Sequence, residues 1–315
     1  MEFSTLNGYK VKDKKAIRSY DTLALMQSDT KLKEGQRVKT KGYYTANDGG
    51  HGEYEIVNQT LTSDGGSIIE LSNGLYAKLI VENGIINAKQ YGIENNETCT
   101  EKLQTMVNLY NNIKIEDLIL NIDDTISLHS DLKIDIVNST INQLSVSNKK
   151  YIFYLNNCNN VLINGNKSIL IGQKPTEVTQ QAGISIENGC RNIIIQGLTL
   201  SSFGGDGLTL GGTENNISNN LSIKNCVITN NLRNGISLIG GLDGVYIENC
   251  DINLSSGANP QTGIDIETWK NTLFNNNIFI YKNKFSENVS GGLKIFENSK
   301  NIFIENNIFC TDNKL

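Results

Sequence analysis

The sequence predicts an all-β protein whose main body is a parallel β-helix, because two short strand-like phrases recur at nearly constant spacing. One phrase is a glycine followed by an alternating apolar strand, and it recurs after 24, 28, 28 and 29 residues. The other is an asparagine followed by a similar strand. No amphipathic helix fits between the phrases, so short strands stacking coil on coil are the expected architecture.

Both phrases can be followed residue by residue in the printed sequence. The first phrase begins at Gly183, Gly207, Gly235, Gly263 and Gly292. The second begins at Asn160, Asn192, Asn220, Asn277 and Asn301, with Gly244 in the place of an asparagine. Apolar positions of each phrase are expected to point inward and to stack about 4.8 Å apart. Asparagine at a fixed place suits a left-handed turn, where its side chain bonds to neighbours in the stack.

The composition narrows the class of protein. The chain has 315 residues, of which 38% are hydrophobic and 19% charged, with 28 basic against 33 acidic side chains. This balance, without a long basic run, argues against nucleic acid as the main partner. The first ten residues lack the apolar core of a secretion signal, so we expect no signal peptide, and no stretch is long and apolar enough to suggest a membrane partner.

Six cysteines are present, but none forms a Cys-x-x-Cys pair, which argues against a zinc site or a disulfide framework. Cys158 and Cys190 occupy one repeat position on successive coils, as do Cys226 and Cys250. We expect stacked, reduced thiols in the turns or core. No metal and no cofactor are expected.

The N-terminal part is expected to be a small β-rich module covering residues 1–82. A short capped helix is expected within residues 19–27. One hairpin joins residues 36–44 to residues 53–57 around a glycine-rich turn, and a second joins residues 67–71 to residues 75–80.

The β-helix is expected to cover residues 83–315 and to begin with a capping helix near residues 98–112. Thr98 and Glu101 have the spacing of a capping box, and Leu103, Met106 and Val107 follow at helical spacing. An amphipathic helix here would cover the open first coil, which otherwise exposes its core. The chain closes near Phe309 on a repeat strand without a capping element, so either it is shortened or a partner covers the last coil.

The chain resembles a family of bacteriophage proteins. Residues 38–44 followed by Asn47-Asp48-Gly49-Gly50 resemble the N-terminal module of many tailspikes, and residues 87–110 resemble the start of their right-handed, pectate-lyase-like β-helix. The match is partial, since residues 91–96 lack the glycine-aspartate run of the family and Thr98 and Cys99 replace two aspartates. The resemblance, notably to preneck appendages, implies a homotrimer on the virion that meets other tail proteins through its N-terminal module. It also implies a protein that binds, and often cleaves, a bacterial surface glycan.

Candidate catalytic residues lie in one column of the aligned coils. The column contains Ser185, Thr209, Ser237, Asp265 and Lys294. We expect it to face outward, with Asp265, Glu267 and Trp269 on one face of one strand. Carboxylates at i and i+2 lie about 6–7 Å apart at Cα, near the separations used in glycoside hydrolysis.

The expected roles leave several alternatives open. Asp265 or Glu267 is the general acid, and the other carboxylate or Asp206 is the base or nucleophile. Trp269, Lys294 and Ser237 are expected to contact the glycan, with Trp269 stacking on a sugar face. The competing interpretations are a surface ion pair between Asp265 and Lys294 and a turn-forming role for Asp206. Lys294 beside Asp265 also leaves a polysaccharide lyase open.

A second outward column is apolar and aromatic. It contains Leu162, Ile194, Ser222, Tyr246, Phe279 and Phe303. Such a column is costly if left in water, so either a segment of the chain or another subunit covers it. The functional hypotheses are a virion-borne glycan depolymerase of the hydrolase type, a non-catalytic receptor-binding or fibre module, and a lyase.

Overall fold

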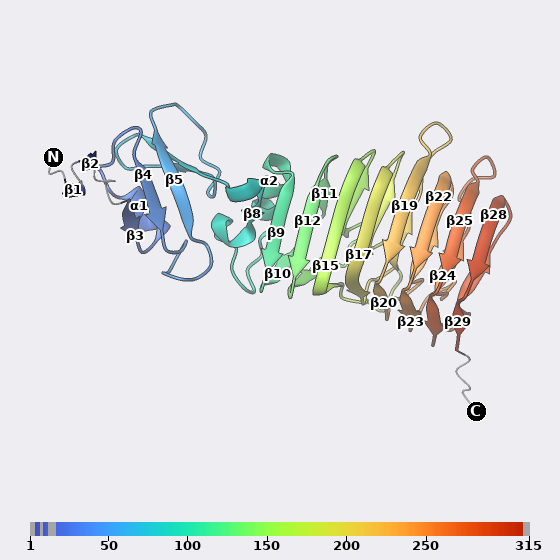
Figure 1. Cartoon of the computed structure of the whole chain (residues 1–315). Coiled ribbons are helices and arrows are strands. Elements are labelled where there is room, and N and C mark those ends of the chain that lie inside the picture. Colours follow the sequence, from blue (N-terminus) through green and yellow to red (C-terminus); the bar gives the residue numbers. More distant parts are fainter. Residues whose placement is uncertain (1–3, 7–8, 12–16, 311–315) are drawn as a thin grey trace. The chain divides into compact units, whose positions relative to one another are not determined.

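The computed structural model describes residues 17–310 and, before them, the antiparallel strands β1 (Ser4–Leu6) and β2 (Tyr9–Val11). The chain divides into two compact units, residues 1–81 with 89–92 and residues 82–88 with 93–315 (Figure 1). Within the part of the chain described, no helix is both long and apolar enough to span a membrane.

The N-terminal unit contains a mainly antiparallel sheet of the order β3-β4-β5-β7-β6. Both expected hairpins are present, β4 with β5 and β6 with β7, and β3 pairs with β4 in parallel. Val38, Tyr54, Ile56 and Ala77 fill the core of this unit. The elements are β3 (Arg18–Tyr20), α1 (Leu23–Gln27), β4 (Arg37–Thr40), β5 (Gly52–Val57), β6 (Ile68–Glu70) and β7 (Tyr76–Leu79). The short helix α1 is capped as expected, because Thr22 Oγ1 accepts the N–H of Leu25 at 3.2 Å.

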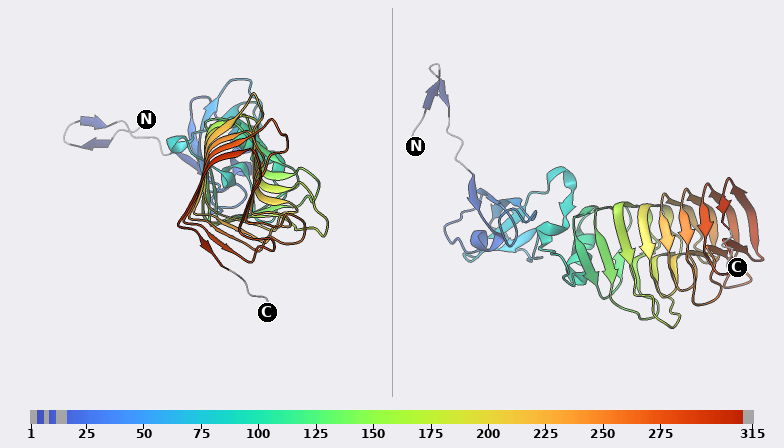
Figure 2. Two further views of the ribbon diagram at one scale, coloured as in Figure 1. Left: turned by 90° about the vertical axis from the view of Figure 1, so that its right-hand side faces the viewer. Right: turned by 90° about the horizontal axis from the view of Figure 1, so that it is seen from below.

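The second unit is the predicted right-handed parallel β-helix, of about eight turns. Figure 2 shows its coils superimposed when they are viewed along the stack. Each full coil contributes strands to three faces. The first face is built from β8 (Ile86–Asn87), β9 (Asn112–Glu116), β12 (Lys133–Val137), β15 (Asn159–Ile171), β17 (Arg191–Ser201), β19 (Ser218–Lys224), β22 (Leu242–Glu248), β25 (Asn275–Tyr281) and β28 (Ser299–Glu305).

The long strands β15 and β17 continue from the first face onto the second. The other strands of the second face are β10 (Ile119–Ile122), β13 (Thr140–Gln143), β20 (Val227–Thr229), β23 (Asp251–Asn253), β26 (Lys284–Ser286) and β29 (Ile308–Phe309). The third face, which matters most for function, is built from β11 (Ile126–Leu128), β14 (Tyr151–Asn156), β16 (Ala182–Glu187), β18 (Asp206–Leu210), β21 (Ile236–Leu238), β24 (Ile264–Ile266) and β27 (Leu293–Ile295).

Glycine recurs near the start of the third-face strands from β16 to β27 for a steric reason. A Cβ on Gly235 would lie 2.5 Å from the carbonyl oxygen of Gly263, and a Cβ on Gly263 would lie 2.5 Å from that of Gly292. Backbones of successive coils therefore approach too closely here for any side chain. The apolar residues that follow the glycines stack in register, as in the series Leu208, Ile236 and Ile264, all fully buried. Burying each such side chain contributes about 1.5–3 kcal/mol.

The repeating asparagines occupy left-handed turns, as expected. Asn160, Asn192 and Asn220 have φ of 58°, 54° and 53°. Their side chains form a ladder, in which Asn192 Nδ2 donates to Asn160 Oδ1 at 2.9 Å and Asn220 Nδ2 donates to Asn192 Oδ1 at 2.7 Å. Gly244 takes the same place with φ of 77°. Asparagine thus satisfies both the backbone conformation and the hydrogen bonding between coils.

A helix is present within residues 98–112, as expected, and it packs beside β11, but its start differs from the prediction. Helix α2 spans Thr100–Leu109 and buries Leu103, Met106 and Val107. The capping box at Thr98 is wrong, because the N-cap is Cys99, whose side chain makes no capping bond. Thr98 instead forms a parallel bridge with Asn121, which keeps the chain extended up to that point. Two short 3₁₀ helices, Glu82–Gly84 and Ala88–Tyr91, precede α2.

The cysteine pairs stack on successive coils as predicted. The backbone N–H of Cys158 donates to Cys190 Sγ at 3.3 Å, and both thiols are buried. Cys226 and Cys250 are also buried and form no disulfide with each other. These thiols act as small core groups in the turns.

Candidate functional site

The predicted column of the third face exists in the predicted register. Ser185 pairs with Thr209, Thr209 with Ser237, Ser237 with Asp265, and Asp265 with Lys294. Parallel pairing places these side chains one coil apart along one line. The interval between neighbours is therefore the distance between adjacent strands.

The outward exposure expected for this column is wrong for Ser185, Ser237 and Asp265, which are all 0% exposed. None of these three side chains therefore reaches solvent. Asn234 contacts Ser237 and Asp265, because its Nδ2 lies 3.0 Å from Ser237 Oγ and 3.4 Å from Asp265 Oδ2. The other oxygen, Asp265 Oδ1, has no hydrogen-bond partner among the described residues. An alternating strand pattern predicts on which side of the sheet a side chain lies. It does not predict which turn residue contacts that side chain.

Burial changes the acidity of Asp265. The pKa of its carboxyl is raised to about 6, first because burial penalises the charged form, and then because Glu267 and Asp206 carry like charge nearby. Arg233 and Lys294 oppose this effect only in part. Asp265 therefore exchanges its proton in the mildly acidic range, as a general acid requires.

Asp206 lies near Asp265, and its carboxylate forms an ion pair with Arg233. Asp206 is 2% exposed, and its carboxylate accepts two hydrogen bonds from Arg233, from Nε to Oδ1 at 2.9 Å and from Nη2 to Oδ2 at 2.5 Å. It also accepts the backbone N–H of Asn234 at 3.1 Å. The pKa of Arg233 is raised, chiefly by its hydrogen bonds to Asp206 and also by the charges of Glu267 and Asp265. Asp206 thus bonds to this guanidinium directly, and Asp265 and Glu267 act on it through their charge.

Glu267 is the accessible acid of this cluster. It is half-exposed and directly follows the end of β24. Its backbone is held on both sides, since its N–H donates to the carbonyl of Leu238 at 2.9 Å and its carbonyl accepts Asn275 Nδ2 at 3.0 Å. A carboxylate on a fixed backbone at the solvent boundary is able to meet a substrate directly.

Trp269 lies in the loop after β24, and not on the strand as expected. The strand ends at Ile266, so the alternation that was expected to align Trp269 with Asp265 stops before it. The Trp269 side chain is 56% exposed, and the Lys270 ammonium lies 4.4 Å from its ring centroid. Exposed tryptophan of this kind is available for stacking.

Trp269 borders a cavity of about 320 Å³ on the third face. Its walls also include Tyr151, Glu187, Thr209 and Ile239. The cavity combines aromatic faces, a carboxylate and a hydroxyl, which is the mixture of apolar and orienting polar groups found in small-molecule sites.

Lys294 is half-exposed and follows Asp265 in the column, but the two form no ion pair within 4 Å in the described part of the chain. The surface ion pair considered from the sequence is therefore not formed.

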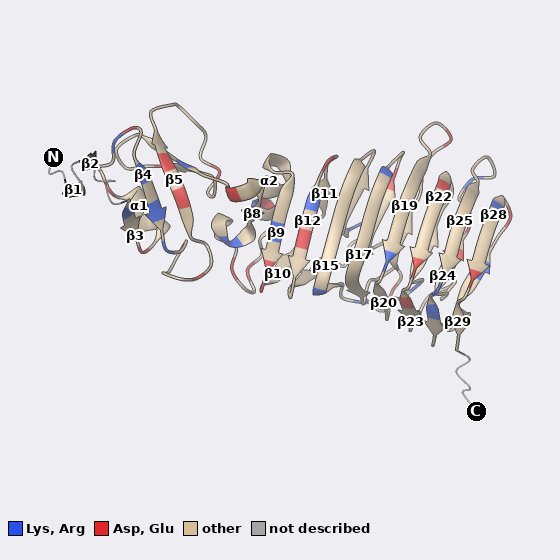
Figure 3. Ribbon diagram, in the orientation of Figure 1, with Lys and Arg blue, Asp and Glu red and all other residues tan. Residues whose placement is uncertain are grey.

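Residues 17–310 contain no group of three or more His, Cys, Asp or Glu side chains that could hold a metal ion. Acidic and basic residues are interspersed along the labelled strands in Figure 3.

Sequence reasoning missed several residues of this region. Arg233 stands two positions before Gly235, and Asp206 directly precedes Gly207, so aligned coils place opposite charges on neighbouring turns. That signal was available. Tyr151 gave no such signal, because its coil lacks the glycine phrase and its place depends on the stacking of β14 on β16.

Comparisons with known proteins agree with this fold. The profile of the phage tail protein small four-stranded beta-sheet domain matches residues 18–82, and that of a right handed beta helix region matches residues 217–314. The tailspike protein gp49 of Acinetobacter baumannii bacteriophage Fri1, a capsular polysaccharide depolymerase, superimposes with a TM-score of 0.72 at 15% identity, over 92% of this chain and 58% of that one. The likeness to bacteriophage tailspikes is confirmed.

Two further relatives extend the comparison. WceF of Pantoea stewartii, a glycan biofilm modifying enzyme with a tailspike-like parallel β-helix, superimposes with a TM-score of 0.54 at 14% identity, over 98% of this chain and 52% of that one. The uncharacterized protein YclG of Bacillus subtilis is 31% identical in an alignment 177 positions long, and the alignment covers 49% of this chain and 30% of YclG. The chain thus spans less than two thirds of the length of each of these proteins. At such identities the superpositions establish the fold.

Proposed function

We propose that the chain is a tailspike-like component of a bacteriophage tail that binds a bacterial surface glycan on the third face of its β-helix and depolymerises it. The observation that carries this proposal is the exposed Trp269, which borders a cavity that Glu187 and Tyr151 also line. Asp265 lies on β24, and Glu267 lies in the loop between β24 and Trp269. The match of residues 18–82 to a phage tail domain and the fold of the tailspikes support the setting.

The proposed chemistry is glycoside hydrolysis by Asp265 and Glu267. This reaction uses a protonated carboxyl that donates to the leaving oxygen and an ionised carboxylate opposite it. Asp265, with a pKa of about 6, is the proton donor, and Glu267 is the second carboxyl group. Because Asp265 is fully buried, the proposed reaction requires a local rearrangement that breaks its contact with Asn234 and exposes it to the glycan. Asp206 serves to hold Arg233 rather than to act as base, because two guanidinium bonds occupy its oxygens.

Product formation tests this function. Purified capsular polysaccharides, teichoic acids and wall polysaccharides are incubated with the protein, and new reducing ends are measured. We expect product from at least one polysaccharide, and none from the Asp265→Asn, Glu267→Gln double variant. Product that persists in the double variant would place catalysis elsewhere.

Two other functions have specific support. Full burial of Asp265 and the engagement of Asp206 by Arg233 favour a non-catalytic receptor-binding module, which would bind polysaccharide without product. Lys294 next to Asp265 favours a lyase, whose products carry an unsaturated sugar that absorbs ultraviolet light. The same incubation distinguishes all three.

The apolar column of the first face supports a homotrimer as the working assembly. Tyr246, Phe279 and Phe303 stack one coil apart with ring centroids 4.8 Å apart in both steps, and Tyr246 and Phe303 are 37% and 46% exposed. Leu162, Ile194 and Ser222 continue the column in register. An exposed aromatic stripe of this kind fits a subunit interface. We propose that residues 1–82 attach this trimer to other tail proteins.

A further inference from the structure

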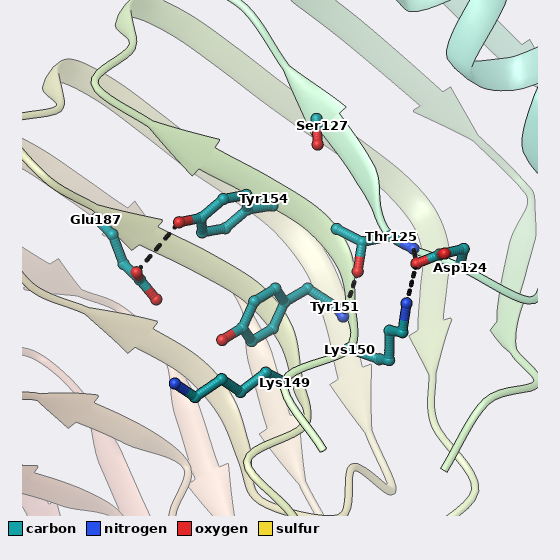
Figure 4. Close-up of a pocket in the computed structure, with 8 residues that line it drawn as sticks. All are labelled: Asp124, Thr125, Ser127, Lys149, Lys150, Tyr151, Tyr154 and Glu187. Carbon is teal, nitrogen blue, oxygen red and sulfur yellow. Dashed lines mark hydrogen bonds and ion pairs between the residues drawn. The ribbon is translucent and has the colours of Figure 1, made fainter. Parts of the chain in front are cut away.

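A second hollow on the third face continues the cavity beside Trp269. It has a volume of about 430 Å³, and its walls include Tyr154, Asp124 and Lys150. Lys149, Tyr151 and Glu187 line both hollows, so the two adjoin, and together they are called the groove below. Figure 4 shows the Tyr151 and Tyr154 rings and Glu187 facing this second hollow from neighbouring strands.

The groove crosses several coils. It runs from β14 across β16, β18 and β21 to the loop after β24, where Trp269 lies. Four steps between adjacent strands amount to about 19 Å. A groove of this length fits an extended chain of sugars rather than a single ring.

The far end of the groove has an arrangement suited to a sugar ring. The Tyr151 and Tyr154 rings stack with centroids 5.4 Å apart and an angle of 21° between their planes. Tyr154 Oη donates to Glu187 Oε2 at 3.2 Å, and Ser185 Oγ donates to Glu187 Oε1 at 2.7 Å. Because an ionised carboxylate offers about four acceptor positions, Glu187 keeps about two for an external donor.

The Tyr154 hydroxyl remains a donor under ordinary conditions. Burial and the neighbouring Glu187 charge raise its pKa to about 12. Lys149, whose side chain lies beside the Tyr151 ring in Figure 4, adds an ammonium donor to the wall. Aromatic faces and a carboxylate acceptor from the paired strands β14 and β16 thus meet an ammonium donor from the turn before β14.

We infer that Tyr151, Tyr154 and Glu187 form a carbohydrate-binding subsite separate from the Asp265 and Glu267 cluster, which binds a sugar ring with adjacent free hydroxyl groups. The apolar face of the ring packs on the tyrosines, and two hydroxyls donate to Glu187. This subsite extends the ligand toward Trp269 along the groove. The inference rests on the proposed function for the identity of the ligand as a glycan.

The contact between Tyr154 and Glu187 could serve only the fold, and a second tyrosine-carboxylate pair in this chain allows that alternative to be tested. Tyr281 on β25 also hydrogen-bonds Glu248, its register partner on β22, and that pair lies on the first face outside the groove. The two pairs therefore give matched variants, Tyr154→Phe and Glu187→Gln in the groove against Tyr281→Phe and Glu248→Gln as controls.

The experiment measures binding rather than cleavage. Capsular polysaccharides, teichoic acids and wall polysaccharides are cut by mild acid to graded lengths, and each is titrated calorimetrically into the wild-type protein and the four variants. We expect Glu187→Gln to weaken binding of the longer fragments about tenfold, because hydrogen bonds to a charged carboxylate are stronger than those to a neutral amide. Binding of the shortest fragments, and all binding by the two control variants, should stay at the wild-type level.

Each other outcome is decisive. Wild-type protein that binds no member of the panel overturns the proposed function and this inference together. Wild-type protein that binds, with Glu187→Gln and Tyr154→Phe equal to it at every length, overturns the subsite alone. An equal loss in the control variants assigns the effect to the fold and also overturns the subsite. Circular dichroism confirms that each variant is folded before titration.

Discussion

Arg233 and Asp206, 27 residues apart in the sequence, meet across neighbouring coils through two hydrogen bonds, Nε to Oδ1 at 2.9 Å and Nη2 to Oδ2 at 2.5 Å. The Asp206 side chain is 2% exposed and that of Arg233 16% exposed. The pair fixes the turn before β21, because Asp206 Oδ1 also accepts the backbone N–H of Asn234. Asn234 Nδ2 also lies 3.4 Å from Asp265 Oδ2, so Asn234 connects the ion pair to the candidate acid.

Removing one partner of this buried ion pair should destabilise the β-helix strongly. We expect Arg233→Met or Asp206→Asn alone to lower the free energy of unfolding by about 3–5 kcal/mol, since each leaves a buried charge unpaired. The double variant should lose much less than the sum of the two. Urea denaturation followed by the fluorescence of Trp269, the single tryptophan, gives the values. Additive losses would show that the two residues act independently.

The raised pKa of Asp265 predicts a pH-dependent stability. The folded-state pKa of about 6 lies above the ordinary value of 3.8. Stability from this group is therefore complete below about pH 4 and is lost as the pH rises toward 6. The ionised buried form costs up to about 3 kcal/mol at neutral pH. Asp265→Asn does not titrate, so it should gain stability relative to the wild type between pH 4 and pH 7, measured by urea denaturation. A difference that is constant with pH would contradict this assignment.

The two kinds of repeat position predict opposite responses to substitution. Gly235→Ala should destabilise the β-helix by several kcal/mol, because its Cβ would lie 2.5 Å from the Gly263 carbonyl and 2.4 Å from Ile252 Cγ2. Gly244→Asn is the matched control, since asparagine occupies the same left-handed position in five other coils. We expect Gly244→Asn to be tolerated. Thermal unfolding of both variants makes the comparison, and equal effects would refute the steric explanation.

Trp269 should contribute to glycan binding without supporting the fold. We expect Trp269→Ala to weaken binding about two- to tenfold, because an aromatic contact contributes about 0.5–1.5 kcal/mol. Trp269→Phe should retain most of the affinity. The melting temperature should not change, since the side chain is more than half exposed. Calorimetric titration with the polysaccharide that the wild type binds measures this effect, and unaltered affinity of Trp269→Ala would exclude the contact.

The aromatic column predicts the assembly state. Phe279→Asp places a charge between Tyr246 and Phe303, and we expect it to dissociate a trimer because burying an unpaired charge at an interface is costly. Ser286→Asp on the second face adds the same charge away from the column and should leave the assembly intact. Light scattering gives the molar mass. A wild-type protein that is monomeric at all concentrations would refute the interface.

Much of the fold could be predicted from the sequence because the coils repeat. The glycine and asparagine phrases predicted the strands, their register and the stacked cysteines, since each coil must satisfy the same contacts as the next. The start of α2 could not be predicted in this way. Thr98 has the right spacing for a capping box, but its pairing with Asn121, a residue of the first irregular coils, competes with that role.

The sequence by itself determined that Ser237, Asp265 and Lys294 stand in one line on one face, because parallel strands in register allow no other arrangement. Only the tertiary structure decided which of these side chains reach solvent. Asn234 hydrogen-bonds to Asp265 and Ser237, the strand ends before Trp269, and Tyr151 approaches Glu187 from another coil. These relationships depend on how turns of unequal length pack above the sheet, and no repeat pattern in the sequence encodes that packing.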